Sequence, residues 1–94
     1  MAKGKMEFNL SVTILREGKR FVAYSPGLDL STSGKTLVEA SRRFTEAAMI
    51  FFEELTKKGT LEEALLDLGW QKKNKVLEPP LVVSQKAEKI MVAA

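Results

Sequence analysis

Residues 21–40 constrain the fold of this 94-residue chain more than any other stretch. They hold two short β-runs, 21–24 and 28–32, which are separated by the dipeptide Pro26-Gly27. Proline cannot donate a ladder hydrogen bond, so this dipeptide belongs between the strands and not inside one. The order of these residues therefore predicts two antiparallel strands joined by a tight turn.

A long helix is predicted directly after the second β-run. Thr36 and Glu39 have the S/T-x-x-E spacing of a capping box, in which two side chains satisfy free backbone amides where a helix begins. Apolar residues recur three and four positions apart over 36–58, a stripe that is expected to cover a sheet. The stripe consists of Leu37, Ala40, Phe44, Ala47, Phe51 and Leu55. Residues 57–59, Lys-Lys-Gly, supply the cations and the glycine that are typical of a helix end.

The N-terminal segment 6–14 alternates between apolar and polar residues, which is the period of a strand with one buried face. Its apolar residues are Met6, Phe8, Leu10, Val12 and Ile14. The tripeptide Glu17-Gly18-Lys19 follows as a hairpin turn, in which Gly18 can adopt a positive φ. Together with the two β-runs at 21–32, this segment predicts a three-stranded antiparallel meander.

The remainder of the chain gives weaker signals. Thr60 and Glu63 repeat the capping-box spacing, so a short second helix is expected, ending at Gly69. Residues 70–77 are a candidate for a further strand. Two short apolar runs follow the Pro79-Pro80 break and can add strands to a sheet edge. They are residues 81–83 and 90–92.

These elements together predict an α+β fold with the order β-β-β-α-α-β. Residues 1–76 are expected to form one domain, because 94 residues suffice for a single core. Residues 77–94 are assigned as a C-terminal tail or edge strand.

Composition narrows the class of protein. No apolar run approaches the roughly 20 residues that cross a bilayer, and the N-terminus lacks the pattern of a signal peptide. The absence of cysteine fits a reducing compartment, so a cytoplasmic location is expected. The formal net charge is +3, with one short basic cluster at residues 72–75 that we interpret as a solvated turn.

The chain lacks the residues on which most catalysis depends. It contains no histidine and no cysteine, which removes the commonest general base, the thiol nucleophile and the soft metal ligands. Ser25 has no accompanying base and is interpreted as a turn serine. Gly34-Lys35-Thr36 is similar to the end of a phosphate-binding loop, but Asp29 stands where that motif requires glycine. We therefore expect no catalytic residue, no cofactor, no metal site and no enzymatic activity.

A second apolar line runs along the predicted long helix, about 100° from the first. It consists of Val38, Thr45, Met49 and Phe52. One interpretation is that the short second helix folds back over part of this surface. The other is a subunit interface, because contiguous exposed apolar patches mark association. The two can coexist, and Val38, Met49 and Phe52 are the candidate residues for assembly into a dimer or higher homo-oligomer.

Several motifs, taken in order, resemble those of the HicB-like antitoxin family. The matching segments are residues 22–28 (Val-Ala-Tyr-Ser-Pro-Gly-Leu), 34–40 (Gly-Lys-Thr-Leu-Val-Glu-Ala), 59–65 (Gly-Thr-Leu-Glu-Glu-Ala-Leu) and 69–70 (Gly-Trp). The resemblance extends over about residues 6–76. Asp29-Leu30, Lys35 and Val38 depart from residues that are frequent in the family. Residues 77–94 are too few for the C-terminal DNA-binding domain of full-length members, so this chain resembles a short member and DNA binding is not expected.

The resemblance implies a non-enzymatic module that sequesters a small basic ribonuclease toxin of HicA type by covering its active site. Glu7, Glu17 and Asp29 are the candidate contacts, because carboxylates steer a basic partner. One alternative is a self-associating structural or regulatory module without a toxin. Another is a direct RNA-binding domain, which the sequence supports less well: Phe8 and Phe21 fall at core positions and not on an exposed RNA-binding face.

Overall fold

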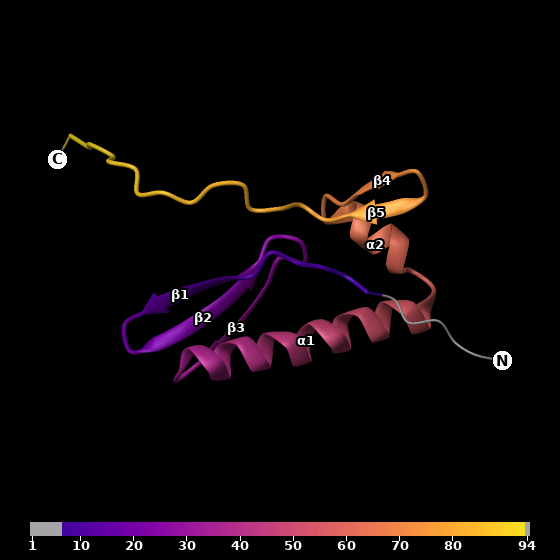
Figure 1. The fold of residues 1–94 in the computed structure, drawn as a ribbon, viewed down its shortest axis with the longest axis horizontal. Coiled ribbons are helices and arrows are strands. Elements are labelled where there is room, and N and C mark those ends of the chain that lie inside the picture. The colour runs from indigo at the N-terminus through magenta and orange to yellow at the C-terminus, as the bar shows by residue number, and fades with distance from the viewer. Residues whose placement is uncertain (1–6, 94) are drawn as a thin grey trace.

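The computed structural model describes residues 7–93 and has the α+β architecture that the sequence predicts (Figure 1). A three-stranded sheet precedes a long helix, and a short helix with a two-stranded sheet follows it. In chain order the elements are β1 (Thr13–Glu17), β2 (Arg20–Ser25), β3 (Leu30–Gly34), α1 (Leu37–Lys58), α2 (Leu61–Asp67), β4 (Gln71–Lys73) and β5 (Val76–Glu78).

The first sheet is the predicted antiparallel meander, in the order β1-β2-β3. Gly18 forms the turn between β1 and β2 with a φ of 59°. Ala23 at the centre of β2 lies opposite Ile14 and Thr32, and it is fully buried against α1. Alternation along β2 places Ala23 and Ser25 on the helix-covered face, so the opposite face of the sheet carries Val22 and Tyr24.

The first strand differs from its prediction. We expected a strand over 6–14, but β1 begins at Thr13, and residues 7–12 belong to no sheet in the described part of the chain. The length of β2 explains this difference. Tyr24 already pairs with Thr13, and the chain turns away after Ser25, so no strand remains opposite residues 7–12. Met6 lies outside the described residues.

The third strand begins two residues later than predicted, at Leu30 instead of Leu28. Residues 26–29 form a wider turn than a Pro-Gly dipeptide requires. Asp29 closes that turn with a φ of 49°, in the left-handed region that aspartate tolerates better than most residues.

Helix α1 begins with Thr36 as its cap, as predicted, and the reciprocal bond of Glu39 reaches the amide one residue before the cap. The Glu39 amide donates to Thr36 Oγ1 at 3.0 Å, and the Glu39 carboxylate accepts from the Lys35 amide at 2.8 Å. The helix ends at Gly59, whose φ is 71°. The buried positions of α1 are Ala40, Phe44 and Ala48.

The predicted apolar stripe of α1 is therefore partly wrong. Ala48 replaces Ala47 as the buried alanine, and Leu37 is half exposed. Positions 40, 44 and 48 lie four apart and form the line that meets the sheet, whereas Ala47 falls about 100° away from Ala48. Leu37 lies in the first turn, directly after the chain leaves β3.

The second capping box is a wrong prediction. Thr60 makes no side-chain cap hydrogen bond and has a ψ of 16°, far from the extended backbone that a cap residue adopts. The Thr60 backbone also belongs to the end of α1, where its amide donates to the Leu55 carbonyl at 3.1 Å. The short helix α2 still forms, and its Leu65 is fully buried.

Residues 70–77 were a candidate for one strand and form a hairpin instead, with β4 pairing β5. Asn74 and Lys75 both have positive φ, 51° and 67°, which is the signature of a tight hairpin turn. The basic cluster 72–75 is exposed on this turn, as expected. Residues 81–83 and 90–92 form no strand in the structure.

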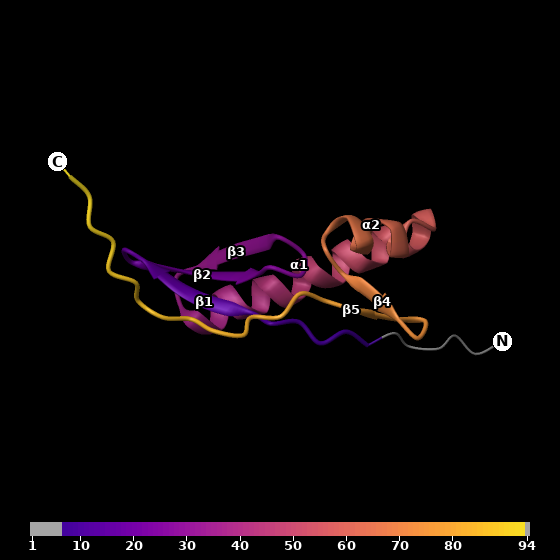
Figure 2. The same cartoon turned by 90° about the horizontal axis from the view of Figure 1, so that it is seen from above.

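The molecule is elongated, with extents of 61 × 30 × 19 Å. Residues 79–93 leave the β4-β5 hairpin and run along the outer edge of β1, in the same direction as β1, and then pass its end (Figures 1 and 2). Among the described residues, no helix is both long and apolar enough to cross a membrane.

Candidate protein-binding surfaces

The three candidate acids are all exposed but are not brought together. Glu17 lies at the β1-β2 turn and Asp29 at the β2-β3 turn, which are opposite ends of the sheet. Glu7 lies on the segment that precedes β1. The sheet therefore presents these carboxylates as separate charges and not as one acidic face.

Asp29 is fixed by a neighbour on β2. Tyr24 donates its hydroxyl proton to Asp29 Oδ1 at 3.1 Å. This hydrogen bond, with a smaller contribution from the nearby charge of Asp29, raises the pKa of the Tyr24 hydroxyl above its ordinary value of 10.0. The Tyr24–Asp29 pair thus forms a positioned polar group at one end of the exposed sheet face.

Basic side chains gather at the other end of the sheet, where the β1-β2 turn, the end of β3 and the start of α1 meet. Arg20 donates to Ser33 Oγ and Arg43 donates to the Ser33 carbonyl. The residues of this basic end are Arg16, Lys19, Arg20, Lys35, Arg42 and Arg43. This cluster could not be predicted from the sequence, because its members come from four separate segments.

The carboxylate of Glu39 lies within this basic end. The hydrogen bond from the Lys35 amide lowers its pKa below 4.5, and the charges of Arg43, Arg42 and Arg20 act in the same direction. Glu39 therefore serves the start of α1, and Glu17 is the other acid at this end of the sheet. Glu17 is surrounded in sequence by Arg16, Lys19 and Arg20, which oppose its attraction for a basic partner.

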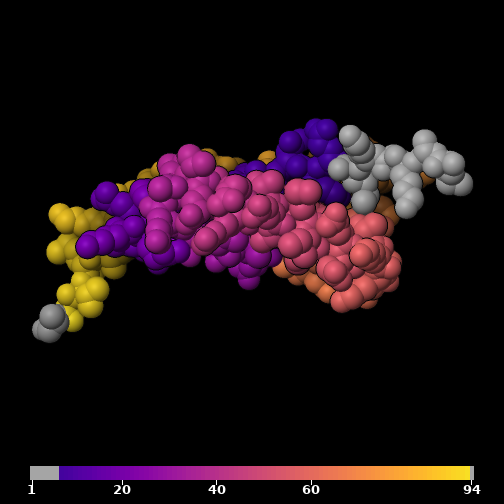
Figure 3. All heavy atoms as spheres, turned by 90° about the horizontal axis from the view of Figure 1, so that it is seen from below, coloured from indigo at the N-terminus to yellow at the C-terminus, as the bar shows by residue number. Residues whose placement is uncertain are grey.

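The three candidate self-association residues have different environments. Val38 is 73% exposed and Met49 is 56% exposed. Phe52 is half-buried, because its ring stacks on Phe8 at a centroid distance of 4.3 Å. Trp70 meets both rings edge-on, at 5.7 Å from Phe8 and 6.4 Å from Phe52. The segment after α2 thus covers the Phe52 end of the second apolar line, and the outer face of α1 stays open (Figure 3).

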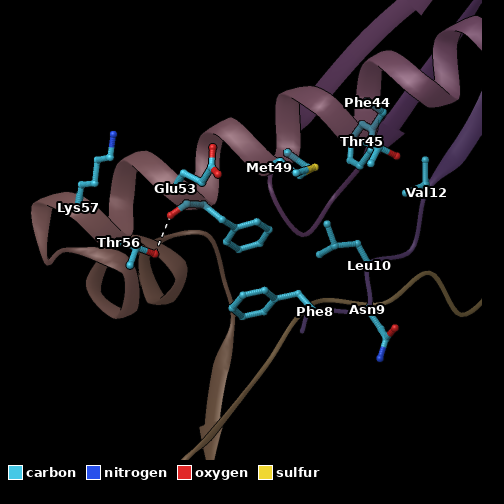
Figure 4. Close-up of a pocket in the computed structure, with 12 residues that line it drawn as sticks. Phe8, Asn9, Leu10, Val12, Phe44, Thr45, Met49, Glu53, Thr56 and Lys57 are labelled. Atoms are coloured by element: carbon cyan, nitrogen blue, oxygen red, sulfur yellow. Dashed lines mark hydrogen bonds between the residues drawn. The ribbon is translucent and has the colours of Figure 1, made fainter. Parts of the chain in front are cut away.

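An open groove of about 1010 Å³ lies between α1 and the segment before β1. Figure 4 shows Leu10 and Val12 pointing toward Thr45 and Met49 on the helix, with Asn9 turned away. Val12 is 40% exposed although it belongs to the apolar row of its segment. Apolar side chains from both walls line this groove, which we name the α1 groove.

The positions that were compared with catalytic motifs lie at the ends of regular elements: Ser25 ends β2, and Lys35-Thr36 lies between β3 and α1. Ser25 is fully buried at the end of β2, and its hydroxyl has no hydrogen-bond partner in the described part of the molecule. Lys35 and Thr36 belong to the helix start described above. Within residues 7–93, no three acidic side chains come close enough together to hold a metal ion.

Comparison of the chain with models of protein families, with curated proteins and with solved structures found no match. The likeness to HicB-like antitoxins therefore depends on the residues and motifs quoted above.

Two features of the surface were beyond sequence reasoning. The basic end is created by the return of β3 and α1 to the β1-β2 turn. The α1 groove exists because residues 7–12 continue past the end of β2 without a partner strand. In the sequence, the alternation of apolar and polar residues over 6–14 indicates the apolar wall of this groove.

Proposed function

We propose that this chain is a non-enzymatic, protein-binding module that acts as HicB-like antitoxins do, by sequestering a small basic ribonuclease toxin. The observation that carries the proposal is the contact between two of the resembling motifs. Trp70 Nε1 donates to the Gly27 carbonyl at 2.7 Å in a buried hydrogen bond. The Tyr-x-Pro-x-Leu turn and the Gly-Trp segment, 43 residues apart, thus form one structural unit.

Because these motifs contact one another in the folded chain, the fold itself requires them to occur in this order. Leu28 and Trp70 are both buried beside this contact, at 3% exposure each. The motifs therefore specify a scaffold, and the scaffold leaves the outer face of the sheet free for a protein partner. The lack of histidine and cysteine supports binding and not catalysis.

Electrostatics favours the Asp29 end of the sheet for a basic partner. The opposite end carries the six cations of the basic end, which repel a basic protein. Trp70 joins the turn that contains Asp29 to the segment after α2, and α2 carries the exposed acids Glu62, Glu63 and Asp67, of which Glu62 pairs with Lys72 at 2.7 Å. We therefore assign Asp29 the largest role among the three candidate acids.

Co-expression with a candidate HicA-type toxin tests the proposal. Rescue of growth and co-purification are expected, and Asp29→Asn should slow association more than the matched change Glu17→Gln. Asparagine is chosen because it tolerates the positive φ of Asp29. The difference should vanish near 1 M salt, where the Debye length is about 3 Å.

The alternatives predict different results. Tight, salt-sensitive RNA binding by the protein alone, together with failure to rescue any candidate toxin, would move the function to RNA recognition through the basic end. Failure of both assays would leave the self-associating module, which the exposed α1 groove favours.

A further inference from the structure

The C-terminal arm, which we define as residues 81–93, is exposed and forms no helix or strand. Two hydrogen bonds connect it to the segment around the start of β1. The Val82 amide donates to Ser11 Oγ at 3.4 Å, and Gln85 Nε2 donates to Thr13 Oγ1 at 3.1 Å. Both involve side chains of the acceptor segment, so no backbone ladder joins the arm to β1.

The arm carries much exposed apolar surface for a segment without a partner. Its large apolar residues are Leu81, Val82, Val83, Ile90, Met91 and Val92. The last three, which we call the terminal triplet, are 77%, 86% and 80% exposed. Contiguous exposed apolar residues of this kind mark a segment that is buried in an assembly.

The arm's own molecule does not bury the terminal triplet. Gln85 lies beside Thr13, so Ile90, five residues further along, comes level with Gly18 at the tip of the β1-β2 hairpin. Figures 1 and 2 show the arm passing this tip and leaving the sheet. The α1 groove lies in the other direction, around Leu10 and Val12.

The chain also offers a strand edge to which an extended segment can pair. Residues 7–12 form no ladder within the described chain, and β1 pairs only with β2. The outer edge of residues 7–17 therefore has no paired strand, although the chain's own arm lies along it through two side-chain hydrogen bonds, and proteins pair or cover such an edge. The α1 groove opens directly beneath this edge, with apolar walls from Leu10, Val12 and Met49 (Figure 4).

We infer that two copies of this chain exchange their C-terminal arms, each arm adding an antiparallel strand to the unpaired edge of residues 7–17 in the second copy, a direction that brings its terminal triplet level with residues 8–12 and into that copy's α1 groove. The exchange is reciprocal, because both copies carry the arm and the groove. It closes as a two-fold dimer and leaves no free arm.

The buried area is sufficient for a stable dimer. Full burial of an aliphatic side chain removes roughly 60–120 Å² of apolar surface from water. The six apolar residues of each arm are partly buried already, Val82 most of all at 38% exposure, so they remove roughly 400 Å². Two arms with the surfaces that receive them then reach the roughly 1,200–2,000 Å² of a standard interface. Backbone hydrogen bonds between the arm and the edge fix the orientation of the arm in this apolar contact.

Molar mass in solution gives the first test. Light scattering on the full chain should give twice the monomer mass of 10.5 kDa. Replacing Ile90, Met91 and Val92 together by glutamate should halve the measured mass and leave the helical signal of the circular dichroism spectrum unchanged, because both helices lie outside the arm and all three side chains are exposed in the single chain. Leu66→Glu, which changes an exposed apolar residue of α2, is the matched control and should remain dimeric.

Disulfide trapping locates the arm, since the chain has no native cysteine. Val12→Cys and Met91→Cys, made as separate proteins and mixed under oxidising conditions, should form a mixed disulfide dimer. Leu66→Cys mixed with Met91→Cys should not. A monomeric mass for the full chain at submillimolar concentration would overturn the inference. So would a dimer that survives the triple substitution, or a Val12→Cys/Met91→Cys double variant that closes its disulfide within one chain.

Discussion

Gly34 shows at the scale of one residue how close the helix comes to the sheet. A Cβ at this position would lie 2.7 Å from the Ala40 backbone nitrogen and 2.9 Å from the Glu39 side chain. The backbone nitrogen cannot move without disturbing the first turn of α1. The glycine therefore permits the close approach of β3 to the helix that follows it.

We expect Gly34→Ala to lower the free energy of unfolding by about 1–3 kcal/mol, the usual cost of overpacking. Lys35→Ala, at the next and exposed position, is the control and should change stability by less than about 0.5 kcal/mol. Urea titration followed by circular dichroism measures both. Equal stabilities for Gly34→Ala and the parent chain would show that the Ala40 backbone yields at little cost.

Glu39 makes the stability of the chain depend on pH. Its pKa is lowered in the folded protein, chiefly by the hydrogen bond from the Lys35 amide. A lowered carboxylate pKa contributes stability that is present above the unfolded value of 4.5 and is lost as the pH falls through the folded value. Glu39→Gln should therefore reduce the loss of unfolding free energy below pH 4.5.

The matched control is Glu46→Gln, which removes an exposed carboxylate from the same helix. Thermal unfolding across a pH series should show a shallower acid limb for Glu39→Gln than for Glu46→Gln. If the two variants have the same acid limb, the capping carboxylate does not govern this part of the pH dependence.

At the scale of elements, the two helices begin in different ways although their sequences have the same S/T-x-x-E spacing. Thr36 accepts the Glu39 amide at 3.0 Å with an extended backbone at the cap position. Thr60 makes no such bond and has a ψ of 16°, and its amide closes the end of α1 by donating to the Leu55 carbonyl. The same motif thus caps one helix and is only part of a tight interhelical connection at the other.

Thr36→Ala should lower the free energy of unfolding by about 1 kcal/mol, the typical value of an N-cap side chain. Thr60→Ala should change it by less than about 0.5 kcal/mol. Chemical denaturation of the two variants under identical conditions measures the difference. A loss at Thr60 as large as that at Thr36 would contradict the structure's account of the second helix.

At the scale of the whole molecule, Trp70 joins parts of the chain that are far apart in sequence. Its indole donates to Gly27 at the β2-β3 turn, and its ring meets Phe8 before β1 and Phe52 on α1. Removing the donor leaves the Gly27 carbonyl buried without this partner. The aromatic contacts, by contrast, can be kept by another ring.

Trp70→Phe should therefore cost about 1–3 kcal/mol, the penalty of an unsatisfied buried acceptor. Trp70→Ala removes the ring as well and should cost about 3–5 kcal/mol. Denaturant titration of both variants separates the hydrogen bond from the packing. Trp70→Phe would contradict this assignment if it were as stable as the parent chain.

The sequence by itself determined the local elements, because their signals lie within a few residues of one another. Alternation and Gly18 predicted the hairpin, and Thr36 with Glu39 predicted the start of α1 to the residue. Only the tertiary structure decided where pairing begins, because the first residue of β1 is set by the length of β2 and not by the alternation of apolar residues over 6–14. The basic end and the α1 groove were decided in the same way, since each is made from segments that the chain brings together only when it folds.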